Sequence, residues 1–247
     1  MAPIQRILAR ILPLTLLPGT LFLAELLFSP VTASGSIWYV SADIGASGNG
    51  TTWSTAFKTP QEAIDAASTG DEIWVKKGTY LLFSKINLDK AVNLYGGFSG
   101  SETQRDQRDW ANNVTTIDSQ GSVYHCFYVT ADATLDGLTI TGGNANGSNW
   151  PDNSGGGILN DNSSPTITNC TFTGNSAGWG GGISNDNSSS PTITNCTFTG
   201  NSADADGGGI YNFENASPTI TDCTFTGNSA DYGGGIENYK SSPTITN

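Results

Sequence analysis

The chain has 247 residues and a formal net charge of −12, with 10 Lys and Arg against 22 Asp and Glu. Charged residues make up 13% of the chain, where about 25% is usual for a soluble domain, so Ser, Thr, Asn and Gly must supply most of the polar surface. After Arg108 the only Lys or Arg is Lys240. Nucleic acids and anionic membrane surfaces require clustered basic residues, so this composition argues against both as partners.

Residues 1–33 have the pattern of a secretory signal peptide. Two arginines precede an apolar stretch at residues 11–28, and residues 31–33 form a small-residue cleavage site. The alternative is an uncleaved membrane anchor, because the stretch is long for a signal peptide. Glu25 and the Pro and Gly residues inside the stretch make a poor membrane span, so we favour cleavage and expect no span in the mature chain.

A short amphipathic helix is predicted near the start of the mature chain. Thr59 precedes Pro60, and Glu62 completes a capping box, which together begin a helix that Gly70 is expected to end. Such a helix would cover the open end of the first coil of a solenoid. Solenoids need a cap of this kind because a bare β edge invites aggregation.

Irregular strands are expected between this helix and residue 150. Residues 71–75 and 92–95 are rich in β-branched and aromatic side chains, which predicts strands. Residues 138–144 parallel residues 170–175 of the later repeats, with one extra glycine. We therefore interpret residues 34–150 as an N-terminal cap followed by degenerate coils.

Residues 151–247 consist of tandem repeats. The phrase SPTITNCTFTGNSA begins at Ser164 and Ser190, SPTITDCTFTGNSA at Ser217, and SPTITN at Ser242. The prolines that follow these serines are 26, 27 and 25 residues apart, a period typical of solenoids. The repeats are dominated by Thr, Asn, Gly and Ser, which are weak helix formers, so we expect β-coils.

Each repeat contains two stretches that alternate at period two, Thr-Ile-Thr and Thr-Phe-Thr, and a third strand is expected at residues 182–184. These strands are too short to fold alone, and stacking the coils about 4.7–4.9 Å apart would bury each apolar face on its neighbours. We therefore predict an all-β, right-handed parallel β-helix solenoid with a short N-terminal capping helix. The inner columns should be Ile167, Ile193, Ile220 and Ile245; Phe172, Phe198 and Phe225; and Ile158, Ile183, Ile210 and Ile236.

Each coil should bend at two corners. Gly-Asn pairs begin at Gly174, Gly200 and Gly227, where the backbone can adopt a positive φ. The second corner is predicted at Asn169 and its counterparts Asn195 and Asp222. The chain stops at Asn247, inside a repeat, so we expect a truncated sequence; the alternative is a natural terminus with a frayed last coil.

The tandem repeats resemble the polymorphic outer-membrane-protein repeats of chlamydial surface proteins and of many bacterial adhesin-like proteins. The paired motifs of those repeats, GG-A-I and F-x-x-N, appear here as the four Gly-Gly-Gly-Ile and three Phe-Thr-Gly-Asn phrases, with Gly in place of Ala. Residues 37–144 look like the amino-terminal part of secreted pectin-lyase-like right-handed β-helix proteins. The matching phrases are IWYV at 37–40, QEAI at 61–64, GDEIWV at 70–75, GTY at 78–80 and YGGF at 95–98. The resemblance implies export and surface display, but no shared chemistry.

Three cysteines, Cys170, Cys196 and Cys223, recur once per coil and should point inward. Together with Cys126 they have no recognised metal-ligand spacing, and stacked parallel strands give poor disulfide geometry. We favour a buried column of small apolar thiols over disulfides or a metal site. The single histidine, His125, adjoins Cys126, which suggests a nucleophile dyad, but adjacent strand residues point to opposite faces, so we expect a surface or strand-edge histidine.

Enzyme chemistry has weak support in the sequence. A lyase needs a base near a calcium-bound carboxylate, and a hydrolase needs suitably separated carboxylates. We interpret Asp204 and Asp206 as solvated loop acids, and the calcium-binding nonapeptide G-G-x-G-x-D is absent. An enzyme remains an alternative because basic residues occur upstream, at Lys85, Lys90, Arg105 and Arg108.

Outward-facing threonines, such as Thr166 and Thr168 or Thr171 and Thr173, should stack into flat arrays. Such arrays resemble the faces of ice-binding β-solenoids and could also dock on ordered polysaccharide, although β propensity with a polar outer face is the simpler interpretation.

We therefore predict a secreted or cell-surface, structural, adhesin-like β-helix protein, associated with the outer membrane if the cell is Gram-negative. No catalytic, cofactor-binding or metal-binding residue is expected. The expected partner is a surface polysaccharide or a host-cell or matrix ligand. The alternative is a carbohydrate-active enzyme or polysaccharide-binding module of the pectin-lyase-like fold.

Overall fold

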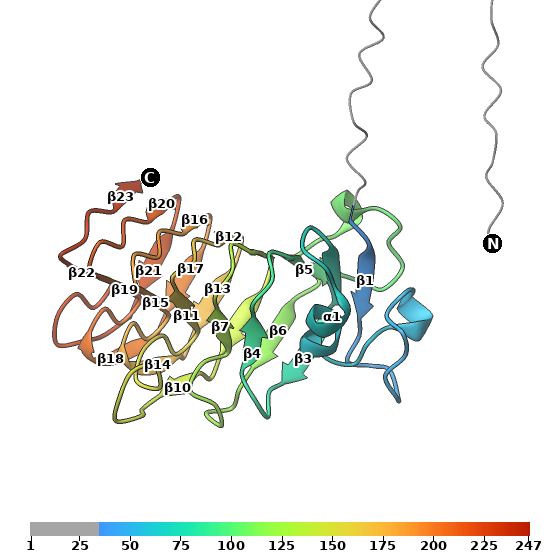
Figure 1. The fold of residues 1–247 in the computed structure, drawn as a ribbon, viewed down its shortest axis with the longest axis horizontal. Helices are drawn as coiled ribbons and strands as arrows, with labels where there is room; N and C mark the ends of the chain where they lie inside the picture. The colour runs from blue at the N-terminus through green and yellow to red at the C-terminus, as the bar shows by residue number, and fades with distance from the viewer. Residues whose placement is uncertain (1–34) are drawn as a thin grey trace, which may run out of the picture. The chain divides into compact units, whose positions relative to one another are not determined.

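The computed structural model describes residues 35–247, and the predicted signal peptide at residues 1–33 lies outside them. Across residues 35–247 the backbone passes through short strands that return to the same position once per coil, and the coils stack one on the next (Figure 1). Every strand pair in this part of the chain is parallel. Among the described residues, no helix is long and apolar enough to cross a membrane.

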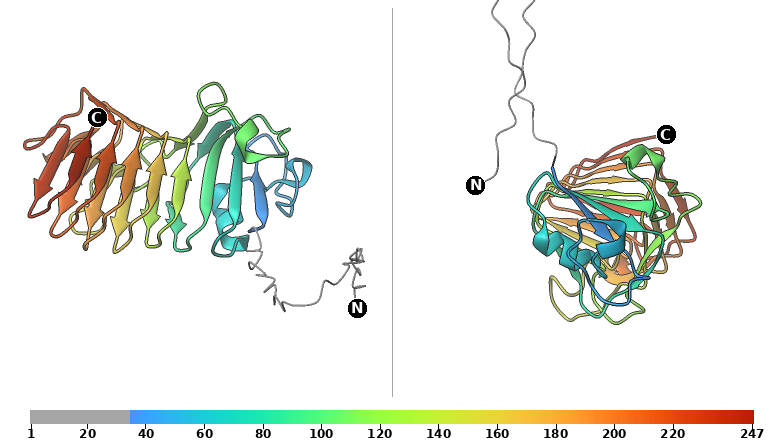
Figure 2. Two further views of the ribbon diagram at one scale, coloured as in Figure 1. Left: turned by 90° about the horizontal axis from the view of Figure 1, so that it is seen from above. Right: turned by 90° about the vertical axis from the view of Figure 1, so that its right-hand side faces the viewer.

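The strands form four sheets, named A to D here, and Figure 2 shows successive strands of a sheet side by side along the stack. Sheet A contains β1 (Ile37–Val40), β2 (Glu72–Lys76), β5 (Asn93–Phe98), β8 (Thr134–Asp136), β12 (Thr166–Thr168), β16 (Thr192–Thr194), β20 (Thr219–Thr221) and β23 (Thr244–Thr246). Sheet B contains β3 (Gly78–Leu81), β6 (Thr115–Asp118), β9 (Thr139–Thr141), β13 (Thr171–Thr173), β17 (Thr197–Thr199) and β21 (Thr224–Thr226).

Sheet C and the smaller sheet D complete the coil. Sheet C contains β4 (Ile86–Leu88), β7 (Phe127–Val129), β11 (Ile158–Asp161), β15 (Ile183–Asp186), β19 (Ile210–Phe213) and β22 (Ile236–Tyr239). Sheet D contains β10 (Asn144–Ala145), β14 (Ser176–Trp179) and β18 (Ser202–Asp206). The strand predicted at residues 182–184 is thus confirmed as β15, whereas sheet D was not foreseen.

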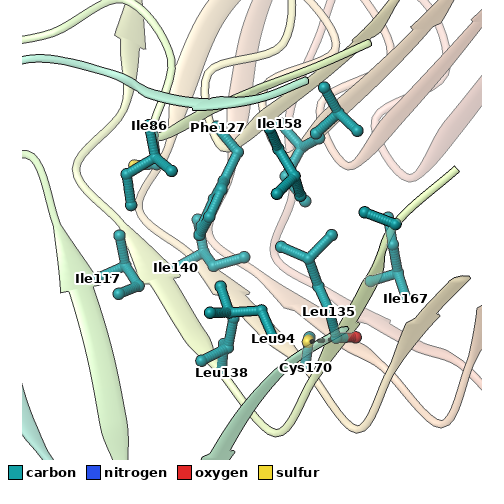
Figure 3. Close-up of a cluster of buried hydrophobic side chains, with 14 of the residues drawn as sticks. Ile86, Leu94, Ile117, Phe127, Leu135, Leu138, Ile140, Ile158, Ile167 and Cys170 are labelled. Carbon is teal, nitrogen blue, oxygen red and sulfur yellow. Dashed lines mark hydrogen bonds between the residues drawn. The ribbon is translucent and has the colours of Figure 1, made fainter. Parts of the chain in front are cut away.

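The three predicted columns of apolar side chains are confirmed. Phe172 pairs with Phe198, and Phe198 with Phe225; the ring centroids are 4.7 and 4.8 Å apart, and the ring planes lie within 4° of each other. The isoleucine columns are also in register, coil on coil. Figure 3 shows Ile167 of sheet A, Ile140 of sheet B and Ile158 of sheet C pointing into one shared interior, and the buried members of the columns belong to this single hydrophobic core. Ile245, on the last strand of the stack, keeps the register but is 52% exposed.

Asparagine ladders hold the predicted corners. Gly174 and Asn169 have φ values of 62° and 52°, in the left-handed region that Gly and Asn tolerate. The side-chain amide of buried Asn175 donates to Asn201 Oδ1 at 3.0 Å, and that of Asn201 donates to Asn228 Oδ1 at 2.9 Å. Each amide thereby satisfies polar groups that the coil's turn would otherwise leave buried without partners.

A further buried asparagine ladder was not predicted. It runs through sheet C, where each Asn side-chain amide donates to the next at 2.7–2.8 Å, through Asn160, Asn185, Asn212 and Asn238. The signal for it was present in the sequence, because an Asn stands two residues after each repeated Gly-Gly-Gly-Ile phrase.

The predicted capping helix is α1 (Pro60–Ala66), with the Thr59–Glu62 capping box in place. Its buried residues Ala63 and Ile64 join the main core, and the helix contacts β1, β2 and β4 at the amino-terminal end of the stack. The helix ends at Ala66, four residues before the predicted stop at Gly70, because the backbone of Ala67 is extended. Lys90 Nζ caps this end by donating to the carbonyls of Ile64, Asp65 and Ala67. Short 3-10 helices occur at Trp53–Thr55 and Arg105–Gln107.

The prediction of one extra glycine near residue 142, relative to the later repeats, was wrong. Thr141 pairs with Thr173 and Asn144 with Ser176, so Gly142 and Gly143 occupy the places of Gly174 and Asn175 without an insertion. The backbone N–H of Gly143 donates to Asn175 Oδ1 at 3.0 Å. Gly143 therefore begins the asparagine ladder with its backbone instead of a side chain.

Candidate functional site

A groove of about 430 Å³ lies over the outer face of sheet C. On β15 and β19 the isoleucines and asparagines face the core, so the alternate residues point outward. The groove is lined by side chains of β14, β15, β19 and the β10–β11 loop, namely Trp150, Asn153, Ser154, Trp179, Asp186, Asn187, Tyr211 and Phe213. Half of these side chains are aromatic.

Both tryptophans of the groove are held by carboxylates of a later coil. Trp150, in the β10–β11 loop, donates its indole Nε1–H to Asp186 Oδ2 at 2.7 Å and is 49% exposed. Trp179, at the end of β14, donates to Asp206 Oδ2 at 3.2 Å. Because each ring is fixed through its polar edge, its apolar face is already oriented before any ligand arrives.

Two carboxylates occupy adjacent coils, one in the groove lining and one beside it. Asp161 on β11 lies in register with Asp186 on β15. Asp186 is 4% exposed and accepts hydrogen bonds from Trp150 and from Ser184 Oγ at 2.8 Å. Burial, and secondarily the charge of Asp161, raises the pKa of Asp186 above its ordinary value.

Asp161 is the better solvated member of this pair. Its oxygens accept hydrogen bonds from Tyr128 Oη at 2.6 Å and from Asn187 Nδ2 at 2.7 Å. Every oxygen of Asp161 and Asp186 therefore has a protein donor. None of these donors carries a charge, so the negative charges are hydrogen-bonded but not neutralised.

The aromatic surface continues beyond the groove toward the carboxyl-terminal coils. Tyr211 stacks on Phe213, with centroids 5.9 Å apart, and Phe213 stacks on Tyr239 of the next coil at 5.7 Å. Phe213 and Tyr239 are register partners on β19 and β22. The rings of Phe213 and Tyr239 thus extend the aromatic surface from one coil to the next along the solenoid axis.

The prediction of a surface or strand-edge His125 was wrong, because the side chain is completely buried. Its Nδ1 lies 3.1 Å from the carbonyl oxygen of Gly155, so Nδ1 carries the proton and donates it. Nε2 has no hydrogen-bond partner among the described residues. Burial lowers the pKa of His125 to about 4. The β10–β11 loop, which ends near Gly155, accounts for this burial.

The cysteines lie in the core, as predicted. Cys170, Cys196 and Cys223 are 1–8% exposed, and all are free thiols in the structure. Cys126 packs in the same core, and burial raises the pKa of its thiol to about 12. His125 instead packs against the ring of Tyr128 on the outer side, so the two adjacent residues belong to different environments.

The interpretation of Asp204 and Asp206 as loop acids was wrong, because both lie on β18 in sheet D. The basic residues upstream have structural partners. Arg108 pairs with Asp136 at 2.6 Å, and Arg105 with Glu72 at 2.8 Å. Across residues 35–247, no group of three or more His, Cys, Asp or Glu side chains is arranged as a metal site.

The outward threonines form the predicted arrays. On sheet A, Thr166 and Thr168 pair in register with the equivalent threonines of β16, which pair in turn with those of β20. The same holds for β13, β17 and β21 on sheet B. These threonine arrays contain no charged side chain, whereas the groove over sheet C is lined by aromatic rings.

The repeat pattern of the sequence did not predict this groove. Its aromatic members stand at positions where the repeats differ, such as Trp179 against Asp206 and Tyr232 in the neighbouring coils. The aromatic residues that lie between the repeated phrases, and that differ from one repeat to the next, were therefore the feature of the sequence that could have indicated the groove.

No curated protein and no solved structure matches the chain. The family model described as a right-handed β-helix region matches residues 98–247, which include the groove, its two tryptophans and the stacked coils beneath them. The chain therefore belongs to the right-handed β-helix family.

Proposed function

We propose that this protein is an exported, cell-surface β-helix that acts as a structural, adhesin-like scaffold and binds a polysaccharide in the groove over sheet C. The observation that carries the proposal is the pair of tryptophans, Trp150 and Trp179, whose indoles are fixed by Asp186 and Asp206 at the edge of an aromatic groove.

This arrangement suits a sugar polymer. Pyranose rings present C–H faces that pack on aromatic rings, and hydroxyl groups that need hydrogen-bond acceptors such as carboxylates and amides. The groove offers both kinds of partner, with Asn153 and Asn187 beside the rings. Because the rings are already fixed, little side-chain entropy is lost on binding.

A carbohydrate-active enzyme is a second candidate function, and one observation favours it. Asp161 and Asp186 form a stacked pair of carboxylates beside the groove, and the pKa of Asp186 is raised, as expected for a proton donor. Against this role, each of their oxygens already accepts a hydrogen bond from the protein. Release of new reducing ends from a bound polysaccharide would favour the enzyme over the scaffold.

Binding can be measured by isothermal titration with cellohexaose, chitohexaose and mannohexaose. We expect at least one of them to bind, and Trp150→Ala and Trp179→Ala each to weaken that binding about fivefold or more, since losing one aromatic platform costs on the order of 1–3 kcal/mol. Phe83→Ala is the control, because Phe83 is 91% exposed and lies outside the groove. Equal affinities in all three variants and the parent protein would refute the proposed site.

Surface display needs its own test. Limited proteolysis of intact cells that produce the full chain should remove the protein, while a cytoplasmic marker stays intact. Protection equal to that of the marker would contradict the cell-surface part of the proposal.

A further inference from the structure

We propose that the groove selects glycans that lack carboxylate and sulfate groups, because Asp186 in its lining and Asp161 beside it on the neighbouring coil carry negative charge without a cationic partner. This inference rests on the proposed glycan binding and names the class of sugar that the site accepts. It separates this protein from a binder or enzyme specific for uronic acid polymers.

The first support is the environment of the two carboxylates. Asp186 lines the groove at 4% exposure, and its register partner Asp161 lies one coil away. Their hydrogen-bond donors are an indole, two hydroxyls and an amide, all uncharged. The four ion pairs within residues 35–247 join other side chains. A charge in a poorly solvated site acts over a longer range than one in water.

The second support is the distribution of basic residues. After Arg108 the chain contains 13 Asp and Glu but one Lys. That residue, Lys240, is already paired with Glu214 at 2.9 Å. Lys85 approaches the sheet C face, but its Nζ lies 4.4 Å from the ring centroid of Tyr128, outside the residues that line the groove.

Further acidic residues add to the negative electrostatic potential of the groove. Asp206 holds the second tryptophan, and Asp152 precedes the groove residue Asn153. Burial is the main cause that raises the pKa of Asp186, and the negative charge of Asp161 acts in the same direction. A uronate carboxylate entering the groove would meet the same repulsion without gaining a cationic partner.

The test compares neutral and acidic hexamers in the full chain by isothermal titration at low ionic strength. The probes are cellohexaose, chitohexaose and mannohexaose against hexagalacturonate, and a fully methyl-esterified hexagalacturonate that has the same backbone without the charge. We expect free hexagalacturonate to bind at least about tenfold more weakly than its methyl ester, and the gap to narrow at high salt.

The double variant Asp161→Asn with Asp186→Asn removes both charges and keeps the shape and one acceptor oxygen of each side chain. We expect it to bring the affinity for the free acid within about threefold of the affinity for the ester. Asp204→Asn is the matched control, because Asp204 is an exposed acid on β18. This variant should leave the ratio of the affinities for the free acid and the ester unchanged. If the double variant does not fold, judged by circular dichroism, Asp161→Asn alone should still reduce the difference in affinity between the free acid and the ester, by a smaller factor.

Two outcomes are distinct. If the free acid binds as tightly as the neutral hexamers, the selectivity is wrong but glycan binding stands. If none of the probes binds, the proposed function fails, and the selectivity fails with it.

Discussion

The indole Nε1 of Trp150 donates a 2.7 Å hydrogen bond to Oδ2 of Asp186, a residue of the following coil. This contact ties the β10–β11 loop to the floor of the groove. It makes Asp186 a positioning residue, which orients the ring that would contact a sugar.

Replacing Asp186 by Ala should therefore weaken glycan binding through Trp150. A hydrogen bond to a charged acceptor contributes roughly 1.5–3 kcal/mol, so we expect about a tenfold loss of affinity for a neutral hexamer. Asp186→Asn should retain most of the affinity, because its amide oxygen can still accept from the indole. Near-ultraviolet circular dichroism should show a larger change in the tryptophan signal for Asp186→Ala than for Asp186→Asn, because only the Ala variant releases the ring. Equal behaviour of the Ala and Asn variants would argue against a positioning role.

His125 should remain neutral in the folded protein down to about pH 4, because burial lowers its pKa to about 4 from an ordinary 6.5. The unfolded chain binds the proton more readily, so the stabilising contribution is complete above pH 6.5 and is lost as the pH falls from 6.5 to 4. The full loss is of order 3 kcal/mol. His125 is the single histidine of the chain, so its ring signals in NMR titrate without overlap.

The matched variant is His125→Asn, whose side-chain amide can still donate to the Gly155 carbonyl. Its free energy of unfolding should vary less between pH 6.5 and pH 4 than that of the parent protein. A His125 signal that titrates near the ordinary value would show that the ring is solvated.

The phenylalanine column should be a main source of stability. Phe198 is completely buried, with Phe172 and Phe225 stacked 4.7 and 4.8 Å away. Phe198→Ala should lower the free energy of unfolding by about 3–5 kcal/mol, measured by urea denaturation. Phe225→Ala should cost less, since Phe225 is only partly buried. The neighbouring outward Thr197→Ala should stay within about 0.5 kcal/mol, and a comparable loss at Thr197 would contradict the inward–outward assignment.

The buried asparagine ladder should tolerate substitution poorly. Asn201 is fully buried; its amide donates to the Phe172 carbonyl and its Oδ1 accepts from the Asn175 backbone. Asn201→Ala leaves the buried Asn175 backbone N–H without its acceptor, so we expect a loss of about 1–3 kcal/mol in unfolding free energy.

The control for the ladder is Asn195→Gly on the exposed ladder, where glycine keeps the φ of 52° and water can replace the lost hydrogen bonds. We expect a change of less than about 1 kcal/mol there. Similar losses at both corners would show that burial of the Asn201 amide is not the cause.

The sequence by itself determined the stacking of this protein. The repeat places Ile167, Phe172 and Cys170 on the inner face, because strand side chains alternate and identical coils stack in register. It also located the corner at Asn169 and the start of the capping helix at Thr59, since these depend on local backbone chemistry.

Only the tertiary structure decided the groove and the burial of His125. Both depend on the β10–β11 loop folding over the outer face of sheet C, where Trp150 reaches Asp186 across 36 positions of sequence. The same holds for Gly143, whose place in the asparagine ladder follows from the register of β10 with β14. A repeat specifies what every coil has in common. A site built from the differences between coils depends on which loops pack together, and that is a property of the folded chain.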